Sequence, residues 1–294
     1  MAPHDPLFKS LFRTFFTGFL RLLAPELADQ LELSDATFLD KEFPATDPPA
    51  RSRVVDLLVR VPLKQAGGKT LLIHVEIEAR ARKGIGERLR SYHRWIQTRH
   101  EEQILSVVVF LRGGRAGVLE QTLANDLAGP GLTVFRYLAF GVAGCRAAEY
   151  LVKPEPLAWA LAALMDPGSW SRAQLKMRCL TRIAGSPLSQ TQRSELVDCV
   201  ETYLQLTPGE AEAFSRLSNP TGRRAQTMLY IETWSDRMKA EGARQVVLSL
   251  LEQRFGVVPA EVRTRVEKIR SLDRLTRLAQ KAVTAKSFKS LRLG

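Results

Sequence analysis

The start of the chain carries apolar residues three and four positions apart, which is the spacing of an amphipathic helix. These positions run from Phe8 to Leu23, so the spacing predicts one helix that ends before Pro25. Asp5 and Pro6 precede the apolar stretch, and this pair is typical of a helix N-terminus. We therefore expect Asp5 to cap the helix, with a role in supporting a site as the alternative.

Several later segments are apolar at nearly every position, as in strands of a sheet that is covered on both faces. Before them, residues 34–53 contain three prolines and predict a loop with one short strand near 38–43. The strand-like segments are 54–61, 71–77 and 104–111, followed by a fourth candidate at 132–137. The sequence therefore predicts at least three neighbouring strands in the first half of the chain.

A helical pattern over residues 86–101 separates the second and third strand segments, with Leu89, Tyr92 and Ile96 on its inner face. The predicted order of elements is helix, strand, strand, helix, strand, or αββαβ. A strand–helix–strand unit of this length permits a parallel crossover. We therefore expect an α/β fold with a mixed central sheet and helices on both faces.

The strand pattern ends near residue 153, and the rest of the chain predicts helices separated by turns rich in proline and glycine. Val246 to Phe255 form the apolar face of one helix, and two short helices are predicted at 260–270 and 272–284. We expect three regions, which are 1–150, a helical extension over 151–236, and a small basic helical domain over 237–294.

Composition narrows the class of protein. The chain has 294 residues, of which 45% are apolar and 25% charged, which excludes a disordered or collagen-like chain. The longest apolar run is shorter than the roughly 18 residues that a membrane span needs. Three widely spaced cysteines, without a CxxC pair, predict reduced structural thiols in a cytoplasmic protein. Charges interrupt the N-terminal apolar stretch, so we expect no signal peptide.

The net charge of +12 lies mainly in two places. Residues 51–100 contain 12 basic and 4 acidic residues, and residues 251–294 contain 11 and 4. Such concentration indicates an acidic partner, with nucleic acid as the first candidate and an anionic membrane surface as the second. Five arginines near the first basic region are candidates for contacts to DNA phosphates: Arg80, Arg82, Arg88, Arg90 and Arg94.

Two carboxylates interrupt strands that otherwise consist of valine, leucine and isoleucine. Asp56 and Glu76 lie on either side of a Gly-Gly turn, which suits two adjacent strands. Glu78 and His74 share the strand face of Glu76, because side chains alternate along a strand. Three converging carboxylates raise each other's pKa unless a cation compensates them. Mg²⁺, or alternatively Mn²⁺, would do so, and such an ion can activate water for attack on a phosphate.

Ordinary structural roles stay open for the two strand acids. Asp56 can form a buried ion pair with Arg53 or Arg60, or it can cap the end of a strand. Glu76 can form a buried salt bridge. The spacing alone is not specific, because many chains contain two acids about twenty residues apart.

Alternatives also stay open for the residues around these acids. Glu78 can lie at a solvated strand end beside Arg80 and Arg82. His74 is more typical of a packed residue, or of one that supports an acid, than of a metal ligand. Tyr92 is predicted to be a core residue, and a hydrogen bond that orients an acid is the alternative.

Short motifs in the first half of the chain resemble those of the Rpn family of recombination-promoting nucleases and the related YhgA-like, transposase-like proteins. The motifs follow one another in the expected order and are HDPLFK (4–9), FLDKEF (38–43), RVVDLL (53–58), HVEIE (74–78) and RLRSY (88–92). The segment LLEQRFG (250–256), followed by Pro259, resembles a small helical domain of unknown function that such proteins often carry.

This resemblance implies a PD-(D/E)xK restriction-endonuclease-like αββαβ core, an all-helical C-terminal region, and Mg²⁺-dependent cleavage of DNA. Asp56 and Glu76 match the two acids that bind the metal. The third position of the motif is commonly lysine in the superfamily and glutamine in this family, but it is Glu78 here. The substitution adds negative charge where a cation is usual, and Arg80 or Arg82 could supply that cation.

Two classes of function follow. The first is a DNA endonuclease in which Asp56, Glu76 and Glu78 are catalytic. The second is a degenerate nuclease fold that holds DNA or a protein partner without cutting, which Glu78 motivates. A membrane-surface protein is a weaker third expectation, because the first helix is needed for the core. A homodimer stays open, since nucleases that cut both strands often dimerise.

Overall fold

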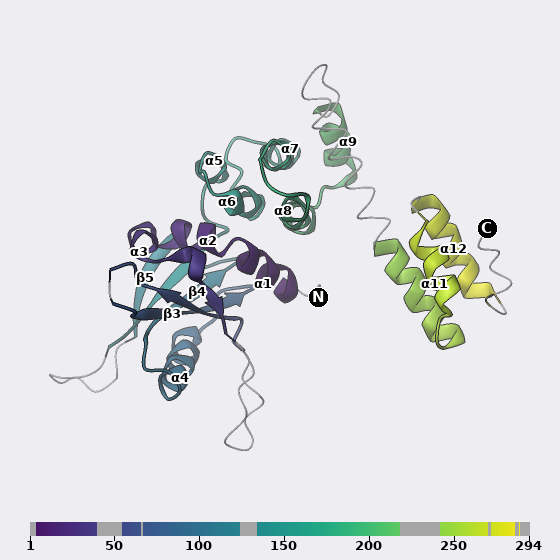
Figure 1. The fold of residues 1–294 in the computed structure, drawn as a ribbon. Coiled ribbons are helices and arrows are strands. Elements are labelled where there is room, and N and C mark those ends of the chain that lie inside the picture. Colours follow the sequence, from purple (N-terminus) through teal and green to yellow (C-terminus); the bar gives the residue numbers. More distant parts are fainter. Residues whose placement is uncertain are drawn as a thin grey trace. The chain divides into compact units, whose positions relative to one another are not determined.

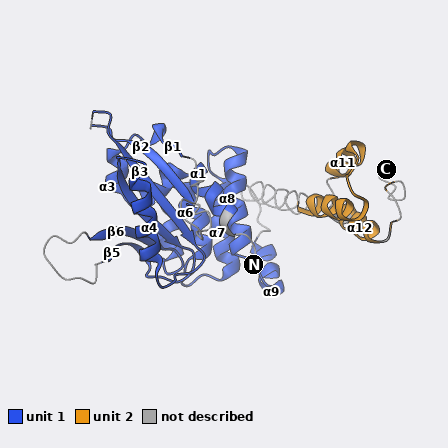
Figure 2. Ribbon diagram, turned by 90° about the horizontal axis from the view of Figure 1, so that it is seen from below, with its two compact units in different colours: residues 1–219 blue, residues 220–294 orange. Residues whose placement is uncertain are grey.

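The computed structural model describes residues 4–39, 55–65, 67–123, 134–217, 242–269, 272–285 and 288. The chain divides into two compact units, residues 1–219 and 220–294, which Figure 2 shows in different colours. The basic region 237–294 lies within the second unit, whereas residues 1–150 and the helices after them share the first unit. Each unit is considered separately below.

Within the described residues, six strands of the first unit form one sheet in the order β1-β2-β3-β4-β6-β5. The strands are β1 (Thr37–Phe38), β2 (Leu57–Pro62), β3 (Thr70–Glu78), β4 (Gln103–Phe110), β5 (Gly117–Leu123) and β6 (Phe135–Gly141). The β3–β4 and β4–β6 pairs are parallel, and the other pairs are antiparallel. The expected α/β class with a mixed sheet is therefore confirmed.

Helices cover both faces of this sheet (Figure 1). One face carries α4 (Ile85–Gln97), whose Leu89 and Ile96 are fully buried against strand residues such as Val108 and Leu72. The other face carries α1 (His4–Thr14), α2 (Phe16–Leu23) and α3 (Pro25–Gln30). Since α4 connects the parallel strands β3 and β4, the predicted crossover is confirmed.

Further helices complete the first unit. They are α5 (Ala147–Leu151), α6 (Pro156–Leu161), α7 (Arg172–Ala184), α8 (Gln190–Tyr203) and α9 (Pro208–Leu217), with 3-10 turns at Leu33–Asp35 and Ala162–Leu164. Reciprocal capping boxes begin two of them, with Ser171 and Gln174 at α7, and Ser189 and Gln192 at α8. The predicted change from strands to helices in the second half is confirmed.

The second unit has its own apolar core. It contains a helix over 242–255, α11 (Ala260–Glu267) and α12 (Leu272–Thr284). Its fully buried side chains include Val247, Leu251 and Leu275. None of the described helices in either unit is long and apolar enough to cross a membrane.

The prediction of one continuous helix up to Pro25 is wrong. The apolar stretch forms two helices, because the backbone leaves the helical region at Phe15, with φ −111° and ψ 31°. Packing explains the break, since α1 contacts β3 and α8 whereas α2 contacts α3 and α6. The structure also places Asp5 inside α1, which already includes His4, so Asp5 is not at the capping position. The Asp5 side chain lies outside the described part.

The strand predictions need three smaller corrections. The segment predicted at 54–61 corresponds to β2, which begins at Leu57, so Asp56 lies just before the strand and not within it. Phe38 does belong to a short strand, β1, while residues 40–43 lie outside the described part. The candidate at 132–137 corresponds to β6, which begins at Phe135, and β5 was not predicted.

Candidate active site

Three of the carboxylates singled out in the sequence meet where β2 begins and β3 ends. The antiparallel register pairs Leu57 with Val75, which brings Asp56 opposite Glu76. Glu78 is the last residue of β3. Side chains at alternate positions of a strand share a face, so Glu76 and Glu78 lie on the α4 side of the sheet, as Leu72 does.

Asp56 is held by the main chain and by one cation. Its Oδ2 accepts a hydrogen bond of 2.8 Å from the backbone N–H of Ile77. Its Oδ1 lies 2.8 Å from Nζ of Lys9, which belongs to α1. Its own backbone N–H donates to Oε1 of Glu76 at 3.3 Å. These contacts fix the aspartate although it precedes the strand.

Glu76 is buried and held from two sides. Nε2 of His74 lies 3.2 Å from Oε1 of Glu76, and Nη2 of Arg88 donates to Oε2 at 3.3 Å. His74 is fully buried, and its ring packs edge-on against Tyr92 with 5.6 Å between the ring centres. Within the described residues Nδ1 of His74 has no partner. The proton is therefore best placed on Nε2, from which it is donated to Glu76.

Glu78 shares its arginine with Glu76. The Nη2 group of Arg88 donates to Oε1 of Glu78, and Nε of Arg82 lies 3.9 Å from Oε2. Each carboxylate oxygen of Asp56, Glu76 and Glu78 therefore faces a donor or a cation. The cluster is an ionic network in which Lys9 and Arg88 balance most of the negative charge.

The crowding of charges shifts the pKa values of Asp56 and Arg88. Burial, together with the charge of Glu76, raises the pKa of Asp56, although Lys9 and the N–H of Ile77 lower it. Burial lowers the pKa of Arg88, but the hydrogen bond and charge of Glu78 and the charge of Glu76 outweigh it, so the pKa is raised overall. A cation beside these acids is thus favoured electrostatically.

The five arginines expected to contact phosphate occupy different environments. Arg88 lies in the acid cluster, and Arg82 is mostly exposed at its edge. Arg90 pairs with Glu87 on α4, whereas Arg80 and Arg94 are exposed. The structure therefore brings Arg88 into contact with the two glutamates and leaves Arg80, Arg82 and Arg94 exposed, with Arg82 near Glu78.

Of the two arginines considered as ion-pair partners of Asp56, the structure describes Arg60. Arg60 is unavailable to it, because its Nε pairs with Glu102 at 2.6 Å. Arg53 lies outside the described residues. The sequence reasoning missed Lys9 as the partner of Asp56. Its one signal was its place in the HDPLFK motif, directly after the buried Phe8.

The donor set fits a divalent ion bound by two carboxylates. Mg²⁺ usually keeps several waters and is bound by one or two carboxylates together with phosphates of the substrate. Asp56 and Glu76 are adjacent oxygen donors and suit such an ion in chemistry. A larger cage is not formed: among the described residues, no three His, Cys, Asp or Glu side chains are grouped to hold a metal ion.

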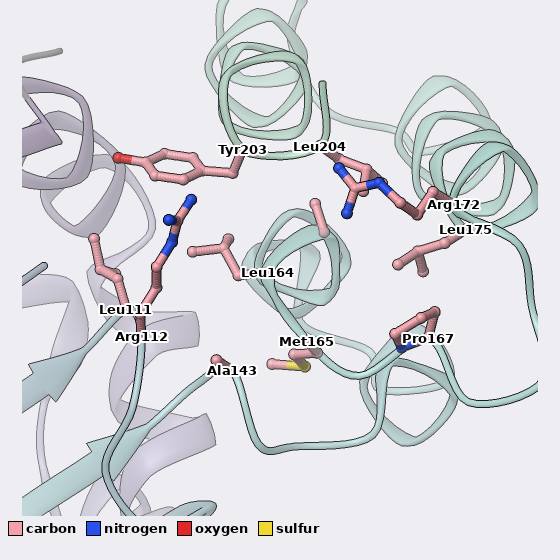
Figure 3. Close-up of a pocket in the computed structure, with 11 residues that line it drawn as sticks. Leu111, Arg112, Ala143, Leu164, Met165, Pro167, Arg172, Leu175, Tyr203 and Leu204 are labelled. Atoms are coloured by element: carbon pink, nitrogen blue, oxygen red, sulfur yellow. The ribbon is translucent and has the colours of Figure 1, made fainter. Parts of the chain in front are cut away.

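A separate pocket of about 410 Å³ lies beside the end of β4 (Figure 3). Its wall is largely aliphatic, with Leu111, Leu164 and Met165 among the lining residues. Arg112 and Tyr203 also line it, and in Figure 3 the Arg112 guanidinium lies next to the tyrosine ring. None of the three clustered carboxylates borders this pocket, so it is distinct from the candidate active site.

No family model matches this chain, and neither a curated protein nor a solved structure was found to match it. Function is therefore inferred from the acid cluster and its surroundings.

Proposed function

We propose that the protein is a metal-dependent DNA endonuclease whose site is the cluster of Asp56, Glu76 and Glu78. The observation that carries the proposal is the placement of Asp56 beside Glu76 at adjoining strand ends, each next to a cation. The order β2, β3, α4 and β4 after the N-terminal helices and β1, with a parallel β3–β4 pair, supports the PD-(D/E)xK core that the motifs imply.

Asp56 and Glu76 would hold Mg²⁺ or Mn²⁺, which when bound lowers the pKa of a water and offsets charge on the phosphate. The water oxygen bonds to phosphorus, and the bond from phosphorus to one deoxyribose oxygen breaks. Glu78 orients the attacking water by accepting a hydrogen bond from it, the proton that the water loses passes to solvent, and the leaving oxygen takes a proton from solvent. The products are a phosphomonoester end and a hydroxyl end.

Neighbouring residues keep the acids in position. His74 is buried and donates to Glu76, while Tyr92 packs against the histidine ring. These two contacts restrict the orientation of the Glu76 carboxylate, which is the role of residues that support a metal ligand. We assign a contact to DNA phosphates to Arg94, which is exposed on the same helix as Arg88.

Incubation of supercoiled plasmid with Mg²⁺ or Mn²⁺ tests the proposal. We expect the intact protein to nick the plasmid and Asp56→Ala or Glu76→Gln to reduce the rate by at least about 100-fold. Glu102→Gln is the matched control, because Glu102 also pairs with an arginine but precedes β4, at the opposite end of the sheet. Nicking that survives in both site variants would refute the assignment.

The salt bridges favour a second candidate, which is DNA binding without cleavage. Lys9 and Arg88 already compensate the carboxylates, so the cluster can persist as a purely structural network. Under this alternative, gel shifts appear without metal, and the plasmid stays supercoiled in Mg²⁺ and in Mn²⁺. The same plasmid and gel-shift experiments therefore distinguish the two functions.

A further inference from the structure

The aspartate of the acid cluster is paired with a cation that lies outside the HVEIE segment, which carries Glu76 and Glu78. Glu78 occupies the motif position where a lysine or glutamine is expected, so the strand itself brings no positive charge. The ammonium of Lys9 lies 2.8 Å from Asp56 instead, and it comes from α1, which is 47 positions earlier in the chain. Among the described residues, Lys9 is the one cation that pairs with Asp56.

The backbone that carries Lys9 is firmly anchored, whereas its side chain reaches the surface. Phe8, Leu11 and Phe12 of the same helix are fully buried in the core of the unit. The Lys9 side chain is 23% exposed, and that of Asp56 is 13% exposed. A lysine has a flexible stem and a compact charge, so its ammonium can move by several ångströms while α1 stays in place.

Arg88 is less suited to such movement. Its Nη2 group bridges Glu76 and Glu78, so release would break two ion pairs at once. Its planar guanidinium also has a fixed geometry, which favours a static role. Lys9 pairs with one carboxylate of the cluster and Arg88 with two, so displacement of Lys9 breaks fewer of the ion pairs within the cluster.

We propose that Lys9 is a displaceable internal cation of this site. Its ammonium pairs with Asp56 in the absence of metal and moves to the DNA phosphate when metal is bound. The inference rests on the proposed function and names how the site is regulated. Lys9 competes with a divalent ion for Asp56. Once displaced, its ammonium supplies the positive charge beside the phosphate that Glu78 cannot supply.

Two opposite effects follow from this dual role. Removal of the Lys9 charge should tighten binding of the divalent ion, because the competitor is absent. The same change should slow cleavage even when the ion saturates the site, because the phosphate loses a cation. A residue that only stabilised the fold would not produce tighter metal binding.

Two measurements test the proposal. The first is a calorimetric titration of the full chain with Mn²⁺ in the absence of DNA, and the second is the rate of plasmid nicking at saturating Mn²⁺. For Lys9→Met we expect roughly tenfold tighter Mn²⁺ binding and nicking at least about tenfold slower. Lys9→Arg should restore both values towards those of the unmodified protein. Lys69→Met is the matched control, because Lys69 is an exposed lysine in the β2–β3 connection.

The outcomes separate this inference from the proposed function. Unchanged or weaker Mn²⁺ binding by Lys9→Met overturns the inference even if the unmodified protein nicks DNA. Tighter binding with undiminished nicking overturns the part that assigns Lys9 to the phosphate. If no protein nicks DNA but Lys9→Met binds Mn²⁺ more tightly, the endonuclease proposal fails and the competition of Lys9 with the metal stands. Melting temperatures identify a variant that fails to fold, in which case Lys9→Gln, which also removes the charge, replaces Lys9→Met.

Discussion

At the end of β3, Glu76 and Glu78 share the single Nη2 group of Arg88. One guanidinium therefore balances two carboxylates, and the second carboxylate is the residue that departs from the nuclease motif. The excess negative charge near the expected phosphate position opposes the approach of DNA. This makes Glu78 the residue at which the enzyme and the binding-only interpretations differ most.

We expect Glu78→Gln to nick plasmid DNA at least as fast as the unmodified protein. The substitution removes one negative charge, and an amide can still orient a water molecule. Glu76→Gln, measured in parallel with Mg²⁺, should be inactive. If Glu78→Gln is as inactive as Glu76→Gln, then the Glu78 carboxylate itself accepts the proton and cannot be replaced.

The sequence singled out Asp56 and Glu76 because a carboxylate is costly within an apolar strand, and Glu78 because it shares the strand face of Glu76. It could not identify their counter-ions in the same way. Lys9 and Arg88 lie on two helices on opposite faces of the sheet, and tertiary packing alone brings both to the same strand ends. Arg60, which is closer to Asp56 in sequence, pairs with Glu102 instead.

Among the elements, helix α4 has a buried face against the sheet. Arg94 is one of its exposed residues, while Arg88 is engaged with the acids. The two arginines should therefore differ in what they contribute, although both were expected to contact phosphate.

Arg94→Gln should weaken DNA binding similarly for all sequences and reduce the salt slope of the affinity by about one. The measurement is fluorescence anisotropy of a short labelled duplex at several salt concentrations. Arg21→Gln, an exposed arginine of α2, removes the same charge from the other side of the sheet. Equal slopes for all three proteins would exclude Arg94 from the DNA interface.

Helix α8 carries Asp198, a carboxylate whose pKa is raised well above its ordinary value. Burial, and then the charges of Glu195 and Glu201, raise the pKa of Asp198 to about 6. Since the folded pKa lies above the ordinary value of 3.8, the contribution of this group to stability is complete below about pH 4. It is lost as the pH rises through about 6.

Asp198→Asn should therefore stabilise the protein at pH 7 and have little effect near pH 4. We expect a gain of about 1 kcal/mol in the free energy of unfolding, after allowance for partial solvent exposure. Urea unfolding at both pH values measures it, with Glu212→Gln on α9 as an exposed control. A gain of the same size at pH 4 would show that the effect is not electrostatic.

Helices and strands were predictable where a single hydrophobic pattern runs through the whole element. β3 and β4 are apolar on both faces, and α4 has a regular apolar stripe, so all three were found from the sequence. β5 was missed because it is an edge strand whose exposed positions include Glu120 and Thr122. The break at Phe15 was missed because the apolar spacing continues through it, and only packing decides where the helix ends.

On the scale of the whole molecule, the two units differ in charge. Residues 220–294 contain 16 basic and 7 acidic residues, whereas residues 1–219 contain 27 and 24. The second unit therefore carries +9 of the net +12. The acids of the candidate site and most of the basic charge belong to different units, each with its own core.

A chain that ends at residue 219 should retain cooperative unfolding and metal-dependent nicking at saturating DNA. It should bind DNA more weakly and with a smaller salt slope, because most of the net positive charge is removed. Calorimetry and anisotropy measure the two properties. An unchanged affinity would mean that the basic second unit does not contact DNA, and lost cooperativity would mean that the first unit depends on it.

The ionic network around Asp56, Glu76 and Glu78 also bears on the order in which the chain folds. During synthesis α1 emerges first, the β2–β3 hairpin follows, and α4 with Arg88 comes last. The hairpin would bring the three carboxylates together before Arg88 is synthesised, and β3 can pair with β4 only after the chain through α4 and β4 has been synthesised. We therefore expect the β2–β3 hairpin to gain little stability by itself, and this part of the protein to assemble in one late step.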